Sequence, residues 1–213
     1  MFRDMSQPPN LDWENRLKLQ GYELIAGIDE AGRGALAGPV IAAAVILSRS
    51  SYPPWFKLVR DSKEISAKKR EFLFHLIQEE VMAVSVGIVS PQIIDAVNIL
   101  KATQLAMKQA VEKLSRQPHF LLIDRLTLPR CPIPQKGITR GDKLCLSIAC
   151  ASIVAKVTRD HIMEELDKIY PGYGFAKHKG YGTRRHVFCL QQLGPSSIHR
   201  LSFAPVKTMI GVK

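Results

Sequence analysis

An apolar run at residues 39–47, PVIAAAVIL, constrains the fold of this chain more than any other feature of its sequence. A strand without polar side chains has to be covered on both faces, as happens in sheets that are flanked by helices. Strand-like and helix-like patterns also alternate along the chain, and no segment has the composition of a linker between domains. Further strands are predicted at residues 23–29, 82–90 and 119–124. We therefore expect an α/β fold with helices on both faces of one sheet.

Helical patterns separate and follow these strands. The main predicted helices are at residues 67–81, 98–115, 144–157 and 183–194, the last of them in the chain. Ser66 is suited to accept a hydrogen bond from the first turn of the first of these helices. In the second, Leu100 and Met107 are predicted to lie on one apolar face. The third is rich in Ala, Ser and Cys, so it can pack closely against the sheet.

The net charge of the chain points to an anionic partner. The formal charge is +11 and the pI is about 9.7, which favours a nucleic acid as the partner. Residues 171–213 contain seven Lys or Arg and no Asp or Glu. Within them, KHKGYGTRRH at residues 177–186 mixes cations with an aromatic ring and glycines, as in surfaces that follow a nucleic-acid backbone. The alternative is an ordinary solvated face.

The cysteines and the apolar segments indicate in which cellular compartment the protein is expected. The four cysteines show neither a C-x-x-C pair nor the spacing of zinc ligands. The N-terminal segment lacks the apolar stretch of a signal peptide, and the longest apolar run is too short to cross a bilayer. We therefore expect a cytoplasmic protein without membrane association, in which Cys145 and Cys150 are small core residues.

Acidic side chains follow two of the predicted strands. Asp29 and Glu30 end the run LIAGIDE, and Asp124 ends HFLLID. Ligands of open α/β sheets bind beyond the carboxyl ends of strands, so Asp29 and Asp124 lie side by side if their strands are neighbours. Glu30 faces the other side of an ideal strand, but its longer side chain can turn to the same edge. Asp142 precedes the small-residue helix and either joins this group or only caps the helix.

A group of carboxylates repels itself unless a cation is bound among them. Ligand sets made only of oxygen atoms select hard cations such as Mg²⁺ or Mn²⁺. A basic surface around such an acidic site is typical of a phosphoryl-transfer nuclease, in which metal ions activate water and stabilise the leaving oxygen. The residues by themselves therefore predict a metal-dependent nuclease.

Six sequence blocks between residues 22 and 199 form a specific pattern. They are GIDEAGRGALAGPV, DSKEIS, LLID, GDK, ASIVAKVTRD and YGFAKHKGYGT. In order and approximate spacing this pattern resembles ribonuclease HII. The resemblance implies an RNase-H-like mixed sheet flanked by helices, with a C-terminal helical extension. It also implies a single catalytic domain, with its core at about residues 22–170 and a basic extension at about residues 171–213.

The resemblance implies an endoribonuclease that hydrolyses the RNA strand of RNA–DNA hybrids and incises 5′ to single ribonucleotides embedded in duplex DNA. The products would carry 5′-phosphate and 3′-hydroxyl ends. By motif, Asp29, Glu30, Asp124 and Asp142 would be the catalytic residues and would bind two metal ions, Mn²⁺ or Mg²⁺. Asp160 lies in an equally well-matched block, but its helical context favours an ion pair or a capping role.

The resemblance also assigns substrate contacts. Gly32, Arg33 and Gly34 match the segment whose backbone reads the 2′-hydroxyl of a ribonucleotide at an RNA–DNA junction. Glycine allows the main chain to approach a ligand closely, and the 2′-hydroxyl is the group that distinguishes RNA from DNA. Tyr181 matches the tyrosine that packs on the neighbouring deoxyribose, and Lys63 resembles a phosphate contact. The implied partners are RNA–DNA hybrids and ribonucleotide-containing duplex DNA, bound by a monomer.

Two departures and two rival interpretations accompany the resemblance. Cys150 stands where the family commonly has a small alanine, which is a mild change in packing. Arg125 stands where the family usually has glycine, and no role is assigned to it. Ribonuclease HIII shares the fold but usually has an N-terminal substrate-binding domain, whereas only about twenty residues precede the first predicted strand here. A non-catalytic basic RNA-binding module would account for the basic segment but not for four acids at strand and helix ends.

Overall fold

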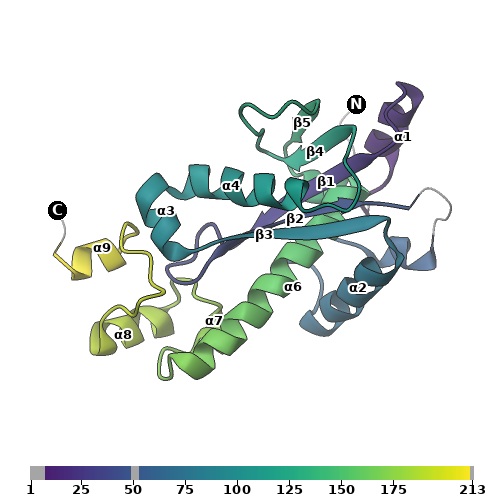
Figure 1. The fold of residues 1–213 in the computed structure, drawn as a ribbon. Coiled ribbons are helices and arrows are strands. Elements are labelled where there is room, and N and C mark those ends of the chain that lie inside the picture. The colour runs from purple at the N-terminus through teal and green to yellow at the C-terminus, as the bar shows by residue number, and fades with distance from the viewer. Residues whose placement is uncertain (1–7, 49–52, 212–213) are drawn as a thin grey trace.

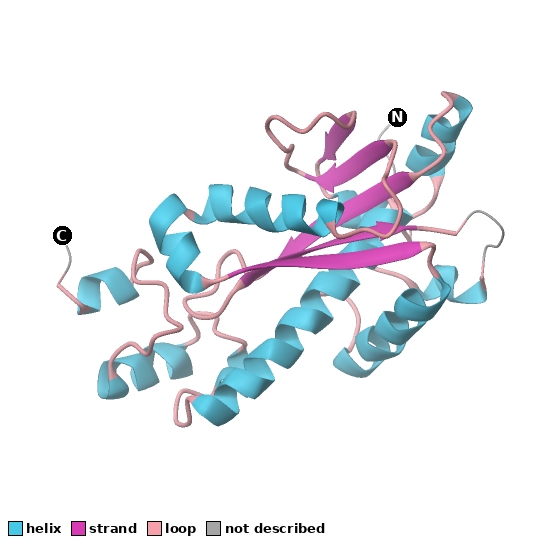
Figure 2. Cartoon of the chain, viewed as in Figure 1, coloured by secondary structure: helices cyan, strands magenta, loops and turns pink. Residues whose placement is uncertain are grey.

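The computed structural model describes residues 8–48 and 53–211 as a five-stranded sheet with helices on both faces (Figures 1 and 2). The strands are β1 (Ile25–Ala31), β2 (Val40–Ile46), β3 (Ala83–Val89), β4 (Phe120–Asp124) and β5 (Gln135–Ile138), in the order β3-β2-β1-β4-β5. β2 is antiparallel to β1 and β3, whereas β4 is parallel to β1 and β5. The predicted α/β fold with a mixed sheet is therefore confirmed.

Helices make up most of the remaining structure. They are α1 (Asp12–Leu19), the 3-10 helix η1 (Pro54–Leu58), α2 (Ala67–Glu80), α3 (Pro91–Val97), α4 (Ile99–Glu112), α5 (Gly141–Leu144), α6 (Leu146–Ile169), α7 (Phe175–His178), α8 (Arg184–Leu193) and α9 (Val206–Met209). Ser66 caps α2 as predicted, since its side chain accepts a hydrogen bond from the N–H of Lys69. The prediction that α8 is the last helix is wrong, because the single-turn helix α9 follows it. The prediction about a signal peptide concerns residues 1–10, of which residues 1–7 lie outside the described ranges.

The two faces of the sheet are covered by different helices. α6 runs along β1 and β2 on one face with α2 beside it, and α4 covers β2 and β3 on the other (Figure 1). β2 is buried along its whole length, as its apolar sequence predicts. Glycines allow both helices to approach: a Cβ atom on Gly27 would lie 2.2 Å from the carbonyl carbon of Ser147 in α6. On the other face, a Cβ atom on Gly87 would lie 2.0 Å from the carbonyl oxygen of Ala106 in α4.

This close approach corrects the predicted orientation of α4. Leu100 is 45% exposed, so its placement on the buried face was wrong. Met107 is buried as predicted, but its neighbours on that face are the small residues Ala102, Ala106 and Ala110. The backbone of α4 lies so near to β3 at Gly87 that a leucine would not fit between them.

The C-terminal helices form a separate group at the end of α6 that is far from α1 (Figure 1). Tyr173, Phe175 and Leu190 belong to their apolar cluster. The predicted helical extension is therefore present. Two isolated bridges, Ala35 with Tyr181 and Ala37 with His199, join this region to the loop between β1 and β2.

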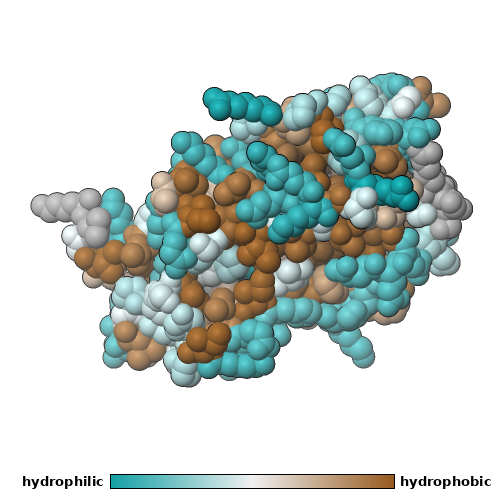
Figure 3. Space-filling model, viewed as in Figure 1, coloured by the Kyte–Doolittle hydropathy of each residue, from teal (hydrophilic) through white to brown (hydrophobic). Residues whose placement is uncertain are grey.

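Polar and apolar residues are interspersed over the face of the molecule drawn in Figure 3. Leu100 and Leu105 on α4 are among the exposed apolar side chains. Among the helices of the described ranges, none is long and apolar enough to cross a membrane. Cys145 and Cys150 are both buried, in agreement with their predicted place in the core.

Candidate active site

The parallel neighbours β1 and β4 carry two aspartates in adjacent positions. Ile28 pairs with Ile123 in the last paired row of these strands, so Asp29 and Asp124 follow directly. The structure thus places the two carboxylates side by side, as the sequence predicts. β1 continues to Ala31, so Asp29 is inside the strand and not at its end.

Asp29 is a buried acid in a like-charged environment. Its carboxylate oxygen Oδ1 accepts a hydrogen bond of 2.7 Å from the main-chain N–H of Glu30, and the Ser152 hydroxyl donates another. Burial, and then repulsion from Glu30 and Asp124, raises the pKa of Asp29 well above its usual range. The two hydrogen bonds oppose this shift only in part. A negative charge at this position therefore needs a cation nearby.

Glu30 turns toward the same region from the neighbouring position of β1. Its Oε1 atom lies 3.2 Å from Nη1 of Arg33. Its Oε2 atom is buried and has no hydrogen-bond partner among the described residues. Burial raises the pKa of Glu30, against the influence of Arg33. Because a buried polar atom without a partner is costly, this oxygen is in the condition expected of a ligand atom.

The start of α5 brings the fourth acid to this group. Oδ1 of Asp124 accepts a 2.7 Å hydrogen bond from the N–H of Gly141, which fixes the turn beside the strand end. Asp142, 7% exposed, lies in the first turn of α5. In the described chain no side chain caps the start of α5 or of α6, so Asp142 does not act as a helix cap. Burial raises the pKa of Asp142, and repulsion from Asp61 and Asp124 raises it further.

Asp61 is an acid near this site that the sequence argument missed. It is 7% exposed, and its Oδ1 atom accepts a hydrogen bond of 3.0 Å from the N–H of Lys63. Burial alone would lower the pKa of Lys63, but Asp61, Asp29 and Asp142 together raise it. Lys63 is thus an exposed cation whose charge interacts with these acids. The only available signal for Asp61 was its place in the block DSKEIS, next to the lysine that was singled out.

The donor atoms of this site suit a hard metal ion. Asp29, Glu30, Asp124 and Asp142 offer only carboxylate oxygens, which are the ligands that Mg²⁺ and Mn²⁺ prefer. The unpartnered Oε2 atom of Glu30 and the raised pKa values fit a site that is completed by a cation. Within residues 8–48 and 53–211, however, no group of three or more Asp, Glu, His or Cys side chains already has an arrangement that could hold a metal ion.

A pocket of about 400 Å³ extends from Glu30 along the loop between β1 and β2, residues 32–39, which is called the glycine-rich loop below. Every residue predicted to contact substrate lines it: Gly32, Arg33, Gly34, Lys63 and Tyr181. Ser62, Ser152 and Lys156 complete the polar part of its wall and were not predicted from the sequence. Residues that are far apart in the sequence therefore form one cavity beside the acids.

Comparison with known proteins identifies the family. The family model for ribonuclease HII matches residues 26–206. A ribonuclease HII from Dehalococcoides mccartyi is 57% identical over 202 residues, which are 95% of this chain and 95% of that protein. The ribonuclease HII of Geobacter sulfurreducens is 49% identical and aligns with 99% of this chain and 96% of its own length. The chain belongs to the ribonuclease HII family.

Solved structures agree on the fold. Ribonuclease H2 from Pyrococcus horikoshii OT3 superposes with a TM-score of 0.71 at 23% identity, covering 88% of this chain and 97% of that one. The RNase HII in a complex with PCNA from Archaeoglobus fulgidus gives a TM-score of 0.70 at 26% identity, covering 85% and 95%. A Bst-RNase HIII in complex with Mn²⁺ gives 0.63 at 18% identity, covering 89% and 70%, and shows the shared fold alone. The sequence match is to ribonuclease HII, so the chain is a nuclease of the RNase H type and a hydrolase.

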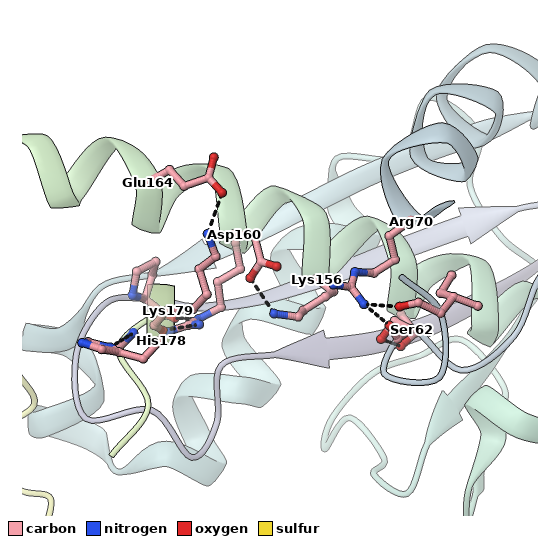
Figure 4. Close-up of polar contacts among 12 residues, drawn as sticks. Ser62, Arg70, Lys156, Asp160, Glu164, His178 and Lys179 are labelled. Atoms are coloured by element: carbon pink, nitrogen blue, oxygen red, sulfur yellow. Dashed lines mark hydrogen bonds and ion pairs between the residues drawn. The ribbon is translucent and has the colours of Figure 1, made fainter. Parts of the chain in front are cut away.

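Two charged residues of α6 lie next to the pocket of this ribonuclease HII family member. Nζ of Lys156 is 2.6 Å from Oδ1 of Asp160, and the labelled side chains point toward each other along the helix (Figure 4). The expectation that Asp160 forms an ion pair is confirmed. Lys156 lines the pocket from the same helix. Burial lowers the pKa of Lys156, against the influence of Asp160.

Arg125, one of the departures noted in the sequence, has an unusual backbone conformation. Arg125 follows Asp124 with a φ angle of 57°, in the left-handed region that glycine adopts most readily. The N–H of Leu126 donates to the carbonyl oxygen of Asp124 at 2.6 Å, which closes a tight turn around Arg125. The turn therefore explains why glycine is suited to this position. The charge of Arg125 also opposes the rise in the pKa of Asp124 that burial causes.

Proposed function

We propose that this member of the ribonuclease HII family is an endoribonuclease that hydrolyses the RNA strand of RNA–DNA hybrids and incises 5′ to single ribonucleotides in duplex DNA. The products would end in a 5′-phosphate and a 3′-hydroxyl. One observation carries the proposal: Glu30, the glycine-rich loop and Tyr181 line the same pocket. A catalytic acid and the groups able to recognise a ribonucleotide are thus within reach of one nucleotide.

In this proposal the acids form the reaction centre. Asp29, Glu30, Asp124 and Asp142 would hold Mg²⁺ or Mn²⁺, which supplies water activation and charge neutralisation at the phosphate when bound. Ser152 donates to Asp29 and Gly141 donates to Asp124, so hydrogen bonds hold both carboxylates in place. Lys63 lies among these charges and would contact a non-bridging phosphate oxygen.

The glycine-rich loop and Tyr181 would supply ribonucleotide recognition. Gly32 has a φ angle of 92°, and Gly34 has open space where a Cβ atom would be. The main chain at these positions can therefore approach a ribose closely, and its polar groups can bond to the 2′-hydroxyl. Tyr181 is 37% exposed, so one part of its ring is available to pack on the adjacent sugar.

The decisive experiment uses an end-labelled DNA duplex with one embedded ribonucleotide, incubated with Mg²⁺ or Mn²⁺. We expect one cut on the 5′ side of the ribonucleotide, and a loss of at least about a hundredfold in rate for Asp29→Asn. Glu79→Gln, which neutralises an exposed acid on α2, is the matched control and should keep full activity. Full activity of Asp29→Asn would contradict the assignment of the acids. Equal cutting of an all-deoxy duplex would contradict ribonucleotide recognition.

A second variant tests the role of Tyr181. Replacing it by Ala should slow incision at a single ribonucleotide more than cleavage of a continuous RNA–DNA hybrid, because only the first substrate places a deoxyribose beside the recognised ribose. The ratio of the two rates is the measurement, since a partly unfolded variant would lower both rates equally. An unchanged ratio would remove Tyr181 from the proposed junction contact.

A further inference from the structure

Two arginines are completely buried behind the glycine-rich loop. Arg159 of α6 and Arg200, which follows α8, are both 0% exposed. Within the described ranges, neither guanidinium makes an ion-pair contact with a carboxylate. Their hydrogen-bond partners are main-chain carbonyl oxygens instead.

Arg159 binds three carbonyl groups from two segments. Its Nε atom donates to the carbonyl oxygen of Pro39 at 3.0 Å, and Nη2 donates to that of Ala37 at 3.1 Å. Nη1 donates to the carbonyl oxygen of Lys179 at 2.8 Å. The guanidinium carbon also lies 5.2 Å from the centre of the Tyr181 ring, within the range of a cation–π contact. One side chain thus holds the glycine-rich loop and the Tyr181 segment together.

Arg200 holds the same loop at other points. Its Nη1 atom donates to the carbonyl oxygen of Arg33, the central residue of the Gly32–Gly34 segment, at 2.9 Å. Nε and Nη2 both donate to the carbonyl oxygen of Gly38, at 3.1 and 2.9 Å. The main-chain N–H of Arg200 donates to the carbonyl oxygen of Leu36 at 2.8 Å. The loop is therefore fixed at three places by one residue of the C-terminal region.

The glycine-rich loop packs tightly against these guanidinium groups. A Cβ atom on Gly32 would lie 2.1 Å from Nε of Arg159, so the main chain rests directly on the arginine. The N–H of Leu36 donates to the carbonyl oxygen of Gly180 at 2.8 Å, beside Tyr181. Lys179, whose carbonyl group binds Arg159, also forms an ion pair with Glu164 of α6 (Figure 4). The loop and the segment before Tyr181 thus share one rigid support.

Stability alone does not explain two buried cations of this kind. A buried charge without a charged partner is costly, and a neutral apolar pair of similar size usually serves stability at least as well. Burial lowers the pKa of Arg200, and repulsion from Arg159 lowers it further. What an arginine offers here is a planar fork that fixes several carbonyl groups in a defined geometry. Such support is what a binding site needs when small displacements of the main chain reduce recognition.

We infer that Arg159 and Arg200 are positioning residues. They hold the main chain of Gly32–Gly34 and the Tyr181 ring in the positions needed to select a ribonucleotide. This inference rests on the proposed function, because it assigns the selectivity of the same pocket. Neither arginine touches the substrate in this role. Their effect is on the preference for ribose over deoxyribose.

The test compares affinities of lysine variants for two duplexes. Arg159→Lys and Arg200→Lys keep the positive charge but lose the planar fork. Dissociation constants are measured for a duplex with one ribonucleotide and for the same duplex in all-deoxy form. We expect the ratio of the two constants to fall by about tenfold, which corresponds to roughly 1.4 kcal/mol. Arg116→Lys, at an exposed arginine remote from the pocket, should keep the wild-type ratio.

The ratio separates positioning from other roles. Partial unfolding lowers the binding-competent fraction and weakens both affinities equally, so it leaves the ratio unchanged. If the lysine variants fold and keep the wild-type ratio, the inference is overturned while the proposed function stands. If wild-type protein itself neither prefers nor cuts the ribonucleotide duplex, the proposed function fails first.

A measurement on the wild-type protein needs no folded variant. The amides of Leu36 and Ala37 donate hydrogen bonds to the carbonyl oxygen of Gly180, and the amide of Gly38 donates to that of Ile198. If the arginines hold the loop in its binding conformation before substrate binds, these amide hydrogens exchange slowly with solvent in the free protein. Binding of the ribonucleotide-containing duplex should then not slow their exchange further. Fast exchange in the free protein that slows only on binding would show a loop ordered by substrate, and would overturn the inference.

Discussion

Nε2 of His186 lies 3.1 Å from Nε2 of His199, and both imidazoles are buried. Nδ1 of His199 accepts a 2.9 Å hydrogen bond from the N–H of Ser196, so its proton is on Nε2. That proton is donated to Nε2 of His186, which leaves Nδ1 of His186 to donate to the carbonyl oxygen of Tyr181 at 2.9 Å. These contacts require both rings to be neutral, because an added proton on either ring would remove one of the three bonds.

This arrangement predicts a loss of stability in acid. Burial, and then repulsion from His186, lowers the pKa of His199 to about 4. The unfolded state, with a pKa near 6.5, binds a proton first as the pH falls. The contribution of His199 is thus fully present above about pH 6.5 and is lost as the pH falls toward 4. We expect this contribution of His199 to the free energy of unfolding to be on the order of 2 kcal/mol.

Urea unfolding at pH 7 and pH 4.5 measures this contribution. His199→Asn keeps an acceptor near the N–H of Ser196 but cannot be protonated. The free energy of unfolding of the wild type should therefore fall more between the two pH values than that of the variant. Equal falls in the two proteins would show that His199 is not a source of the pH dependence.

Arg125 provides a prediction about backbone strain. Since its φ angle is 57°, Arg125→Gly should raise the free energy of unfolding by about 0.5–1 kcal/mol, as the left-handed conformation is unfavourable for residues with a Cβ atom. Arg125→Ala is the matched control, because it removes the same side chain but keeps the Cβ atom. We expect the alanine variant to stay within about 0.5 kcal/mol of the wild type in thermal or urea unfolding. A glycine variant no more stable than the alanine variant would contradict the strain argument.

The sequence predicts the acids of the site well because each is tied to a local pattern. Asp29 and Asp124 each follow an apolar run, and parallel pairing of those runs brings them together. Asp142 is in a short motif that begins a helix. In each case the neighbouring residues in the chain mark the acid as lying at or near the end of a strand or the start of a helix. The sequence alone is therefore enough to select these acids as candidates.

The sequence does not reveal the support behind the glycine-rich loop. Arg159 and Arg200 would be expected on the surface, since arginine is rarely buried without a partner. Their burial depends on carbonyl groups of a loop more than a hundred residues away in the chain. Contacts of this kind come from the assembled fold and leave no local pattern.

Glu14 provides a test of how α1 is attached to the sheet layer. Its Oε1 atom accepts hydrogen bonds from the N–H and the hydroxyl of Ser147, at 2.9 and 2.7 Å. Burial raises the pKa of Glu14 in spite of these bonds. The favourable contribution of Glu14 is therefore present below its unfolded pKa of about 4.5 and is lost as the pH rises through the folded value.

Glu14→Gln keeps the acceptor oxygen and removes the charge. The stability of the variant relative to the wild type should thus increase from pH 4 to pH 7, by about 1 kcal/mol. Glu14→Ala lacks the acceptor and should be less stable than the wild type by about 1–3 kcal/mol at both pH values. Urea unfolding gives these differences. A difference between the glutamine variant and the wild type that does not change with pH would contradict the assignment of a raised pKa.

Asp29 connects stability with the proposed metal site. Burial and repulsion from Glu30 and Asp124 raise its pKa, so its charged form disfavours folding near pH 7. Asp29→Asn should therefore raise the melting temperature in the presence of a chelator, although we expect the variant to lose activity. Functional sites commonly show this exchange of stability for activity.

Adding Mn²⁺ should reverse the order of the two proteins. A ligand that binds only the folded state adds about 2.7 kcal/mol at a hundred times its dissociation constant, and wild-type protein should gain most of this. Asp29→Asn lacks one ligand and should gain much less, whereas Glu79→Gln should respond like the wild type. Melting curves with chelator and with millimolar Mn²⁺ give the comparison. If Mn²⁺ stabilises Asp29→Asn as much as the wild type, the ion binds elsewhere, and the four carboxylates are not its site.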